Sequence, residues 1–359
     1  MPAARSYATV GSVLELNGVH VGSLRAATGG EAYGDVIEET VGPDLVVRKH
    51  IAGLRYSDIE FECGSRMSKD VYTWIADMLD RKSPHKSGAV VTVDYAYKER
   101  RRLAFSNALI SEVGFPALDA TSKDAAHIAV KITPEFAHPA PGSGADVKGS
   151  LGGGKPKQWL RSNFQLTIDG LDCKMVNRIE SLVVRQAVVE GAVGEQRDYL
   201  KQPSAIDVGD LVLTLAESHA QDWYAWHHDF VVRGNNGAPF EKTGKLQLLA
   251  PSTREVLFEL TFKGLGIHRL AGERQSEAGA EGISRVRASM YCEEVTFAVP
   301  SVMATASATS GNGSAPPPNG GEPAAPPPPS RVEAVAALAR LEPERLLPAR
   351  EGASRIRPT

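Results

Sequence analysis

Two kinds of hydrophobic periodicity follow one another along the chain, and the pair occurs twice. Apolar residues at every second position predict a strand with one buried face at 59–63 and again at 211–215. After each strand the apolar spacing changes to three and four residues, which predicts an amphipathic helix. The inner positions of these helices are Val71, Trp74, Ile75, Met78 and Leu79 in the first, and Trp223, Trp226, His227, Phe230 and Val231 in the second. Ser68 is expected to cap the first helix, and Ser218 with Gln221 to form a capping box at the second.

Further strands are predicted after each helix. They span 90–95, 103–110 and 126–136 in the first half, and 245–249, 256–265 and 286–297 in the second. A single helix against many strands indicates a small β-barrel or sandwich with one covering helix. The predicted fold class is therefore a β-rich α+β protein made of two such units.

The two halves are related by a fixed offset of 152 residues. From about residue 14 to residue 79 they align without a gap, so that LELNG at 14–18 meets LTIDG at 166–170 and Trp74 meets Trp226. Only about a dozen positions are identical, but they fall at matching turns and apolar positions. Because one offset accounts for all of them, the sequence predicts a tandem duplication, with insertions after residue 80.

Two stretches interrupt the globular pattern. Residues 141–159 are rich in Gly, Pro and Ser, which indicates a flexible linker. Residues 301–330 end in APPPNGGEPAAPPPPS and bury too little apolar surface to offset their ordering entropy. The predicted organisation is a first domain at 1–140, the linker at 141–159, a second domain at 160–300, a disordered Pro/Gly-rich tether at 301–330, and a short helical or disordered tail at 331–359.

Composition narrows the function classes. The formal net charge of -3 provides no strong field for nucleic acid or an acidic membrane surface. Cys63, Cys173 and Cys292 show no C-x-x-C spacing, so we expect half-buried thiols and neither a disulfide framework nor a zinc site. The N-terminus lacks the apolar region of a signal peptide, and no apolar run reaches the ~18 residues of a membrane span. We expect assembly in the cytoplasm, with later release as an extracellular particle left open.

Several features recur in the same order in both halves. They are an opening strand and its turn (14–18 and 166–170), an apolar-acidic strand (36–38 and 188–190), a Gly-containing polar arm (42–56 and 194–208), a Trp-bearing helix (Trp74 and Trp226), and a strand with an Asn or Gly turn (Asn107 and Gly264). This order resembles the tail tube proteins of contractile-tailed phages and their relatives in extracellular contractile injection systems and type VI secretion. The resemblance covers about 280 residues and rests on no single diagnostic motif. The second domain and the long C-terminal extension depart from the family's usual pattern.

The resemblance implies a structural protein and no enzyme: a subunit of the inner tube of a contractile phage-tail-like particle. Family domains close into hexameric rings around a lumen, so two domains per chain imply a trimer with pseudo-sixfold symmetry and stacked rings. Ring closure also pairs strand edges that would otherwise be exposed. The implied partners are further copies of the chain, the contractile sheath protein, spike and baseplate proteins, and cargo in the lumen. No cofactor, membrane or nucleic-acid specificity is expected.

The polar arms are the expected contacts between stacked rings. Both are longer than a hairpin loop of about 2–5 residues, occur at the same place in each repeat, and carry charge. The expected contact residues are Arg48, Lys49 and Arg55 in the first arm, and Arg197 and Lys201 in the second. Two mobile surface loops remain the alternative interpretation. Trp74 and Trp226 are expected in the core.

Some local patterns suggest other chemistry but have simpler explanations. Residues 149–155 fit the spacing of a phosphate-binding loop, yet Pro156 stands where Ser or Thr must ligate magnesium. His219, His227 and His228 lack the HExxH spacing of a zinc site.

Charged residues are also explained without a binding site. Asp70 and Asp222 recur at helix starts, where negative charge is favourable. The basic run KERRR at 98–102 lies at a predicted hairpin without interleaved aromatic residues, so a solvated tip is favoured over nucleic-acid binding. We therefore expect no catalytic, metal-binding or cofactor-binding residues.

Two other functions remain open. A tube initiator or baseplate hub adaptor, joining a trimeric spike to a hexameric tube, would have the same symmetry and differ only in copy number. A stalked β-domain binding module would be monomeric and would display clustered aromatic residues. The aromatic content of 6%, mostly at core-spaced positions, argues against the binding module.

Overall fold

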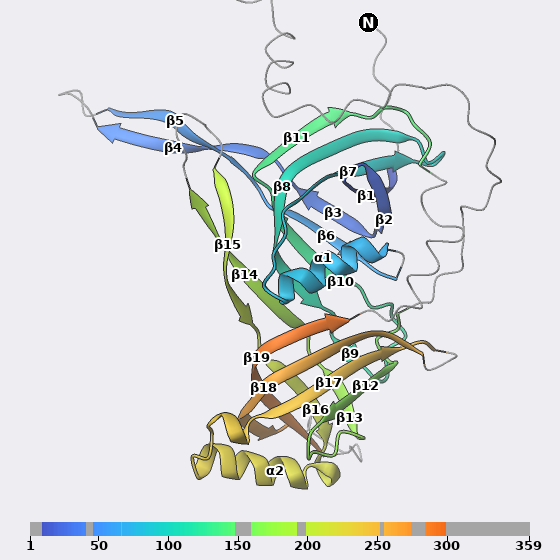
Figure 1. Cartoon of the computed structure of the whole chain (residues 1–359), viewed down its shortest axis with the longest axis vertical. Helices are drawn as coiled ribbons and strands as arrows, with labels where there is room; N and C mark the ends of the chain where they lie inside the picture. Colours follow the sequence, from blue (N-terminus) through green and yellow to red (C-terminus); the bar gives the residue numbers. More distant parts are fainter. Residues whose placement is uncertain are drawn as a thin grey trace, which may run out of the picture. The chain divides into compact units, whose positions relative to one another are not determined.

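The computed structural model is β-rich, with two main sheets and a separate two-stranded hairpin (Figure 1). The structure describes residues 9–40, 46–65, 67–147, 159–191, 199–251, 255–273 and 284–298. These described residues all lie within one compact unit, Met1–Gly311. The predicted tether and tail at 301–359 lie outside the described residues.

The elements follow the predicted order in both halves. In the first half they are β1 Thr9–Leu16, β2 Val19–Leu24, β3 Ala26–Gly29, β4 Ala32–Thr40, β5 Val47–Tyr56, β6 Ile59–Cys63, α1 Lys69–Leu79, β7 Lys86–Asp94, β8 Glu99–Phe115, β9 Leu118–Asp119, β10 Ile128–Thr133 and β11 Phe136–Pro141. In the second they are β12 Phe164–Ile168, β13 Val176–Ile179, β14 Leu182–Gly191, β15 Leu200–Val208, β16 Leu211–Ala216, α2 Gln221–His227, β17 Lys242–Leu249, β18 Val256–Gly272 and β19 Arg285–Ala298.

Six strands keep the same order in the two main sheets. The larger sheet contains β1-β7-β8-β10-β6-β3 and the smaller contains β12-β17-β18-β19-β16-β13. The cross-strand register recurs as well: the matched pairs are Leu14–Val90 and Leu166–Leu246, Val90–Leu103 and Leu246–Leu260, and Ile110–Ile132 and Ile267–Met290. The alternating patterns of the two halves are thus built into equivalent ladders.

The turns recur with the register. Gly18 (φ 80°) and Gly170 (φ 71°) both follow the opening strand in the left-handed region, which favours glycine. Asn107 (φ 50°) and Gly264 (φ 63°) occupy matching left-handed positions inside β8 and β18. Asn is among the residues that tolerate this conformation, which explains the Asn-or-Gly alternation found in the sequence.

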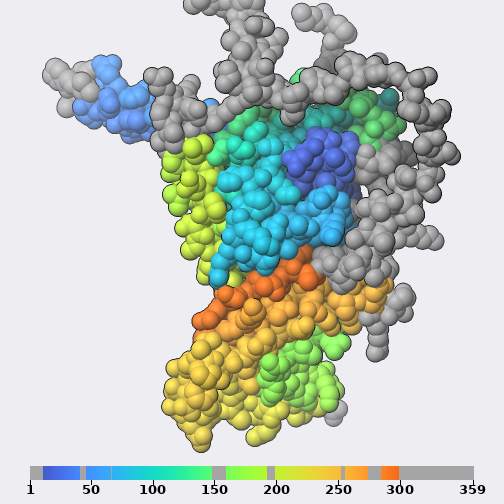
Figure 2. Space-filling view, viewed as in Figure 1, coloured from blue at the N-terminus to red at the C-terminus, as the bar shows by residue number. Residues whose placement is uncertain are grey.

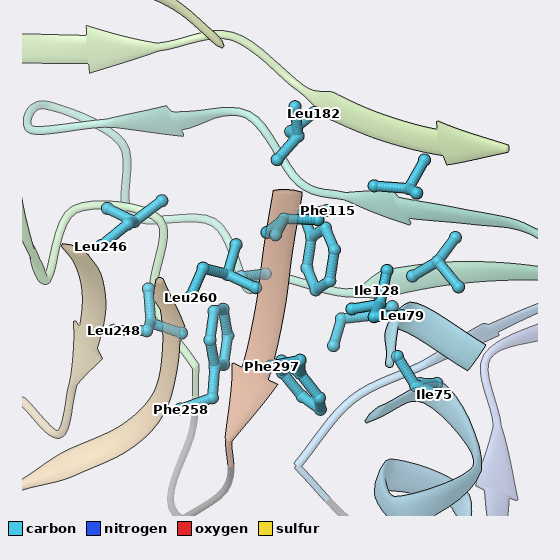
Figure 3. Packing of buried hydrophobic residues seen from close by; sticks show 14 of the residues in the cluster. Ile75, Leu79, Phe115, Ile128, Leu182, Leu246, Leu248, Phe258, Leu260 and Phe297 are labelled. Atoms are coloured by element: carbon cyan, nitrogen blue, oxygen red, sulfur yellow. The ribbon is translucent and has the colours of Figure 1, made fainter. Parts of the chain in front are cut away.

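The two halves share one hydrophobic core. Phe115 of β8 lies with its ring centroid 6.5 Å from Phe258 and 5.7 Å from Phe297. Figure 3 shows these rings between Ile75 and Leu79 of the first half and Leu246 and Leu248 of the second. The strands also cross over, because β14 joins β8 in the larger sheet and β9 joins β13 in the smaller. The predicted division into two domains is not seen as two separate cores.

Both ends of the predicted linker contact the body of the protein. The N–H of Gly142 donates to the carbonyl of Arg100 (3.0 Å), and Val147 is fully buried. Trp159 is 1% exposed, with its ring centroid 5.1 Å from that of Phe258. Residues 148–158 lie outside the described residues.

Both predicted helices are confirmed, but only the first begins as predicted. Ser68 caps α1 as predicted, since its Oγ accepts the N–H of Asp70 at 3.3 Å. The capping box at Ser218 is wrong, because Ser218 lies in a 3₁₀ turn, Glu217–His219, and α2 begins after Ala220. The second helix continues as a π-helical turn, His228–Val232, which shifts the helical periodicity, so that Val231 is exposed (44%).

Candidate assembly surfaces

The predicted polar arms are the return strands of two long β-hairpins. β4 pairs with β5, and β14 pairs with β15, in the same register and with an irregularity at the same step. The tips, at 41–45 and 192–198, lie outside the described residues, and Arg197 with them. An equivalent ion pair crosses each hairpin: Lys49 Nζ lies 2.5 Å from Glu38 and Lys201 Nζ 3.4 Å from Glu190. We call β4–β5 the first hairpin and β14–β15 the second hairpin.

The surroundings of the two hairpins differ. β14 adds to the edge of β8, where Leu182 faces Phe115 and Val184 faces Val113. Arg185 Nε pairs with Glu112 Oε2 at 3.0 Å beside this junction. Within the described residues, β4 and β5 pair only with each other. Figures 1 and 2 show the first hairpin extending from the sheets and β15 lying along the first half.

The second hairpin is fixed to the first half by buried polar contacts. The backbone N–H of Lys201 donates to Glu135 Oε1 (2.9 Å), and His85 Nε2 lies 2.9 Å from the carbonyl of Lys201. Gln186 Nε2 donates to Ser83 Oγ at 2.5 Å. These partners were not anticipated from the sequence, because they come from loops far away along the chain.

The predicted arm residues fall into different environments. Arg48 and Lys49 are exposed on β5. Arg55 donates from Nε to Asp35 (2.8 Å) and from its guanidinium to Glu190 of the second hairpin, and these hydrogen bonds raise its pKa. Lys201 is only 6% exposed. The structure thus brings Arg55 and the second hairpin together.

Glu190 is a residue that the sequence interpretation did not single out. It contacts Arg55 and Lys201 and so links the two hairpins. The offset of 152 contained the signal, since Glu190 aligns with Glu38, which makes the matching contact to Lys49.

The two tryptophans are buried. Trp74 is 1% exposed and its indole N–H donates to the carbonyl of Pro84 at 3.0 Å. Trp226 is 8% exposed, and neighbouring Trp223 is fully buried with its N–H on the carbonyl of Asp172 (3.0 Å).

The remaining patterns form no common site. His219 Nδ1 lies 2.9 Å from Asp172 Oδ2, which lowers the pKa of that carboxyl. No group of three or more His, Cys, Asp or Glu residues arranged for a metal occurs in the described part of the chain. The loop-like pattern at 149–155 lies outside that part.

The basic run opens β8 at the predicted hairpin. Arg100 pairs with Asp94 (2.6 Å), and Arg102 bridges Glu15 (2.7 Å) and Glu99 (2.8 Å). Arg100 and Arg102 therefore have carboxylate partners. No helix among the described residues is long and apolar enough to cross a membrane.

No family model and no curated protein matches the sequence. Solved structures similar to part of the chain include the baseplate of the anti-feeding prophage (15% identity, 38% of this chain, 91% of that chain, TM-score 0.31). Another is the sheath–tube complex of the extracellular contractile injection system PVC in its extended state (16% identity, 39% of this chain, 94% of that chain, TM-score 0.35). A third is Hcp1 from Flavobacterium johnsoniae (14% identity, 38% of this chain, 96% of that chain, TM-score 0.25).

Proposed function

We propose that the chain is a structural subunit of the inner tube of a contractile phage-tail-like particle, and that it arose by tandem duplication. The observation that carries the proposal is the recurrence of strand order, register and hairpins in the two halves. One chain therefore supplies two similar building units, already joined through β14 and β8. Three chains joined in the same way give six units around a ring.

The resemblance of the sequence to tail tube proteins supports the same assembly. In that family the polar arm reaches the adjacent ring. Arg48, close to the tip of the first hairpin, and Arg197, in the tip segment of the second, are the residues we assign to stacking contacts. Contacts between exposed charges weaken as salt screens them, so stacking should depend on ionic strength.

The test is the assembly state of the purified chain. We expect three 38.4-kDa chains per ring by mass measurement, and stacked rings in negative-stain micrographs. Arg48→Glu should shorten the stacks while rings persist, and the difference from the parent should be largest at low salt, where the charges are least screened. The control Arg233→Glu reverses an exposed charge just after the π-helical turn His228–Val232 and should leave the stacks unchanged.

Other outcomes contradict the proposal. Monomers alone at high concentration, with no rings, would favour a stalked binding module. A single ring per particle would identify the chain as an initiator or hub adaptor between a trimeric spike and the tube.

A further inference from the structure

We propose that successive copies of this chain join by adding the first hairpin of one copy to the open edge of β18 in the next, at residues 269–272. This contact repeats between chains the β14–β8 pairing found within each chain. It rests on the proposed ring and specifies the contact that closes it. The partner is a second copy of the same chain, bound by strand addition.

The acceptor edge lies at the end of β18. One edge of β8 pairs with β7 as far as Ala108 and then with β14 at 112–115. The other edge of β8 pairs with β10 along this stretch. On β18, β17 pairs as far as Leu265, and no strand of the described residues continues along that side. Residues 269–272 are the counterparts of 112–115 at the offset that relates Phe105 to Phe262.

The incoming edge lies at the start of β4. The N–H of Ser57 donates to the carbonyl of Glu31 at 2.9 Å, just as Gly209 donates to Val183 at 2.9 Å. Glu31 therefore corresponds to Val183, and Ala32 to Val184. Backbone groups alternate in direction along a strand, so Ala32 directs its N–H and C=O away from β5. This side of β4 is equivalent to the side by which β14 pairs with β8.

Burial differs between the equivalent positions in the way this contact predicts. Val113 and Val184 face each other across the β8–β14 junction and are fully buried. Their counterparts are Leu270, half-buried, and Ala32, exposed. Within the chain, the β8 and β14 surfaces cover each other. The equivalent surfaces on β18 and β4 are both less covered. An interface with different surfaces on the two sides propagates head to tail and closes if the rotation allows.

A second set of residues repeats the pattern. Glu135 is 6% exposed and accepts the backbone N–H of Lys201. In β19 its place is taken by Glu293, because Phe136 pairs with Ser106 as Glu294 pairs with Lys263. Glu293 is exposed.

Lys49 provides the matching donor. It has the register of Lys201 in its hairpin, and its side chain is 60% exposed. Glu293 of one copy is therefore placed to accept the N–H of Lys49 from the next. The Arg55–Glu190 contact is not expected to repeat, because Asp207 occupies the position equivalent to Arg55.

A cysteine pair in the predicted register tests the contact. Glu31 should face Ala271 of the neighbouring copy, as Val183 faces Gly114. Glu31→Cys with Ala271→Cys in the full chain should form disulfides between copies under mild oxidation, giving covalent dimers and trimers on a non-reducing gel. Tyr33→Cys with Ala271→Cys is the control: the pair shares a face but is displaced by two residues, where Cα atoms about 7 Å or more apart cannot be bridged.

The native cysteines should not interfere. Burial raises the pKa of Cys63 to about 12, and those of Cys173 and Cys292 to about 11. Few of these thiols are thiolates at pH 8, so the engineered pair should react first.

A proline at the incoming edge provides the second variant. Ala32→Pro removes an N–H that points away from β5, so the hairpin should survive while strand addition is lost. We expect monomers with an unchanged far-UV circular dichroism spectrum, whereas Ala32→Ser should still assemble.

The outcomes separate this inference from the proposed function. If the Glu31→Cys, Ala271→Cys variant forms rings but no disulfide under oxidation, or if rings persist in Ala32→Pro, the inference is overturned and the tube assignment stands. Register-specific cross-links in open chains or unstacked rings support the inference and contradict the tube.

Discussion

Residues at equivalent positions of the two halves are not energetically equivalent. Trp74 is buried and its indole N–H is satisfied by Pro84, whereas the buried indole N–H of Trp226 has no hydrogen-bond partner within the described part of the chain. Lys242 Nζ lies 5.3 Å from the ring centroid of Trp226 instead. The offset in sequence thus predicts burial at both positions but not the polar contacts.

The tryptophan pair gives a first prediction. Trp74→Ala should lower the free energy of unfolding by roughly 3–5 kcal/mol, because it leaves a large cavity. Trp74→Phe should cost about 1 kcal/mol more than Trp226→Phe, since only Trp74 loses a hydrogen bond. Guanidinium denaturation of the four proteins, with the parent as reference, measures these differences. Equal losses in the two Phe variants would mean that the Pro84 bond contributes nothing.

Glu99 gives a pH-dependent prediction. Its carboxylate is buried, which opposes ionisation, but hydrogen bonds from Arg102 and Ser143 outweigh burial and lower its pKa below 4.5. A lowered pKa means that Glu99 stabilises the fold above the unfolded value of about 4.5, and that this contribution is lost as pH falls through the folded value. The melting temperature should therefore fall below pH 4.5, and less steeply in Glu99→Gln. Parallel curves for the two proteins would exclude this role.

At the scale of elements, the sequence predicts what is local and misses what is not. Alternation located β6 at Ile59–Cys63, and the helical spacing located α1, because each pattern records which side chains of one segment face the core. Alternation does not record which strand lies alongside. The addition of β14 to β8 depends on residues about 70 positions apart, so it was not anticipated. The arms were expected to be loops because their residues are polar. Polarity along the sequence does not indicate that each arm pairs with the strand before it.

Glycines at matched positions of the ladder give the third prediction. A Cβ on Gly88 would lie 2.0 Å from the carbonyl oxygen of Glu15, and one on Gly244 3.0 Å from Ile168 Cγ1. A Cβ on Gly11 would meet nothing within 4 Å. Alanine should therefore cost about 1–3 kcal/mol at Gly88, less at Gly244 and within about 0.5 kcal/mol at Gly11. Thermal unfolding of the three variants gives the order, and a Gly88 variant as stable as the Gly11 variant would contradict the close contact.

At the scale of the whole molecule, the shared core bears on how the chain unfolds. Phe115 of the first half packs against Phe258 and Phe297 of the second, and Leu182 of β14 is 3% exposed in the same cluster. Separating the halves would expose these side chains to water and break the β8–β14 pairing. The two halves are therefore expected to stabilise each other.

The last prediction follows from this coupling. A monomeric form of the chain, such as Ala32→Pro, should unfold in one cooperative transition, with tryptophan fluorescence and circular dichroism changing together. Residues 160–300 expressed alone should not reach the native fold, because they lack β8 and the Phe115 contact. Phe115→Ala should shift the single transition by roughly 3–5 kcal/mol without splitting it. Two separate transitions, or a folded 160–300 fragment, would instead support two independent domains joined by a linker, as the Gly-rich segment suggested. Calorimetry decides between them, because the calorimetric and van't Hoff enthalpies agree only when the halves unfold as one.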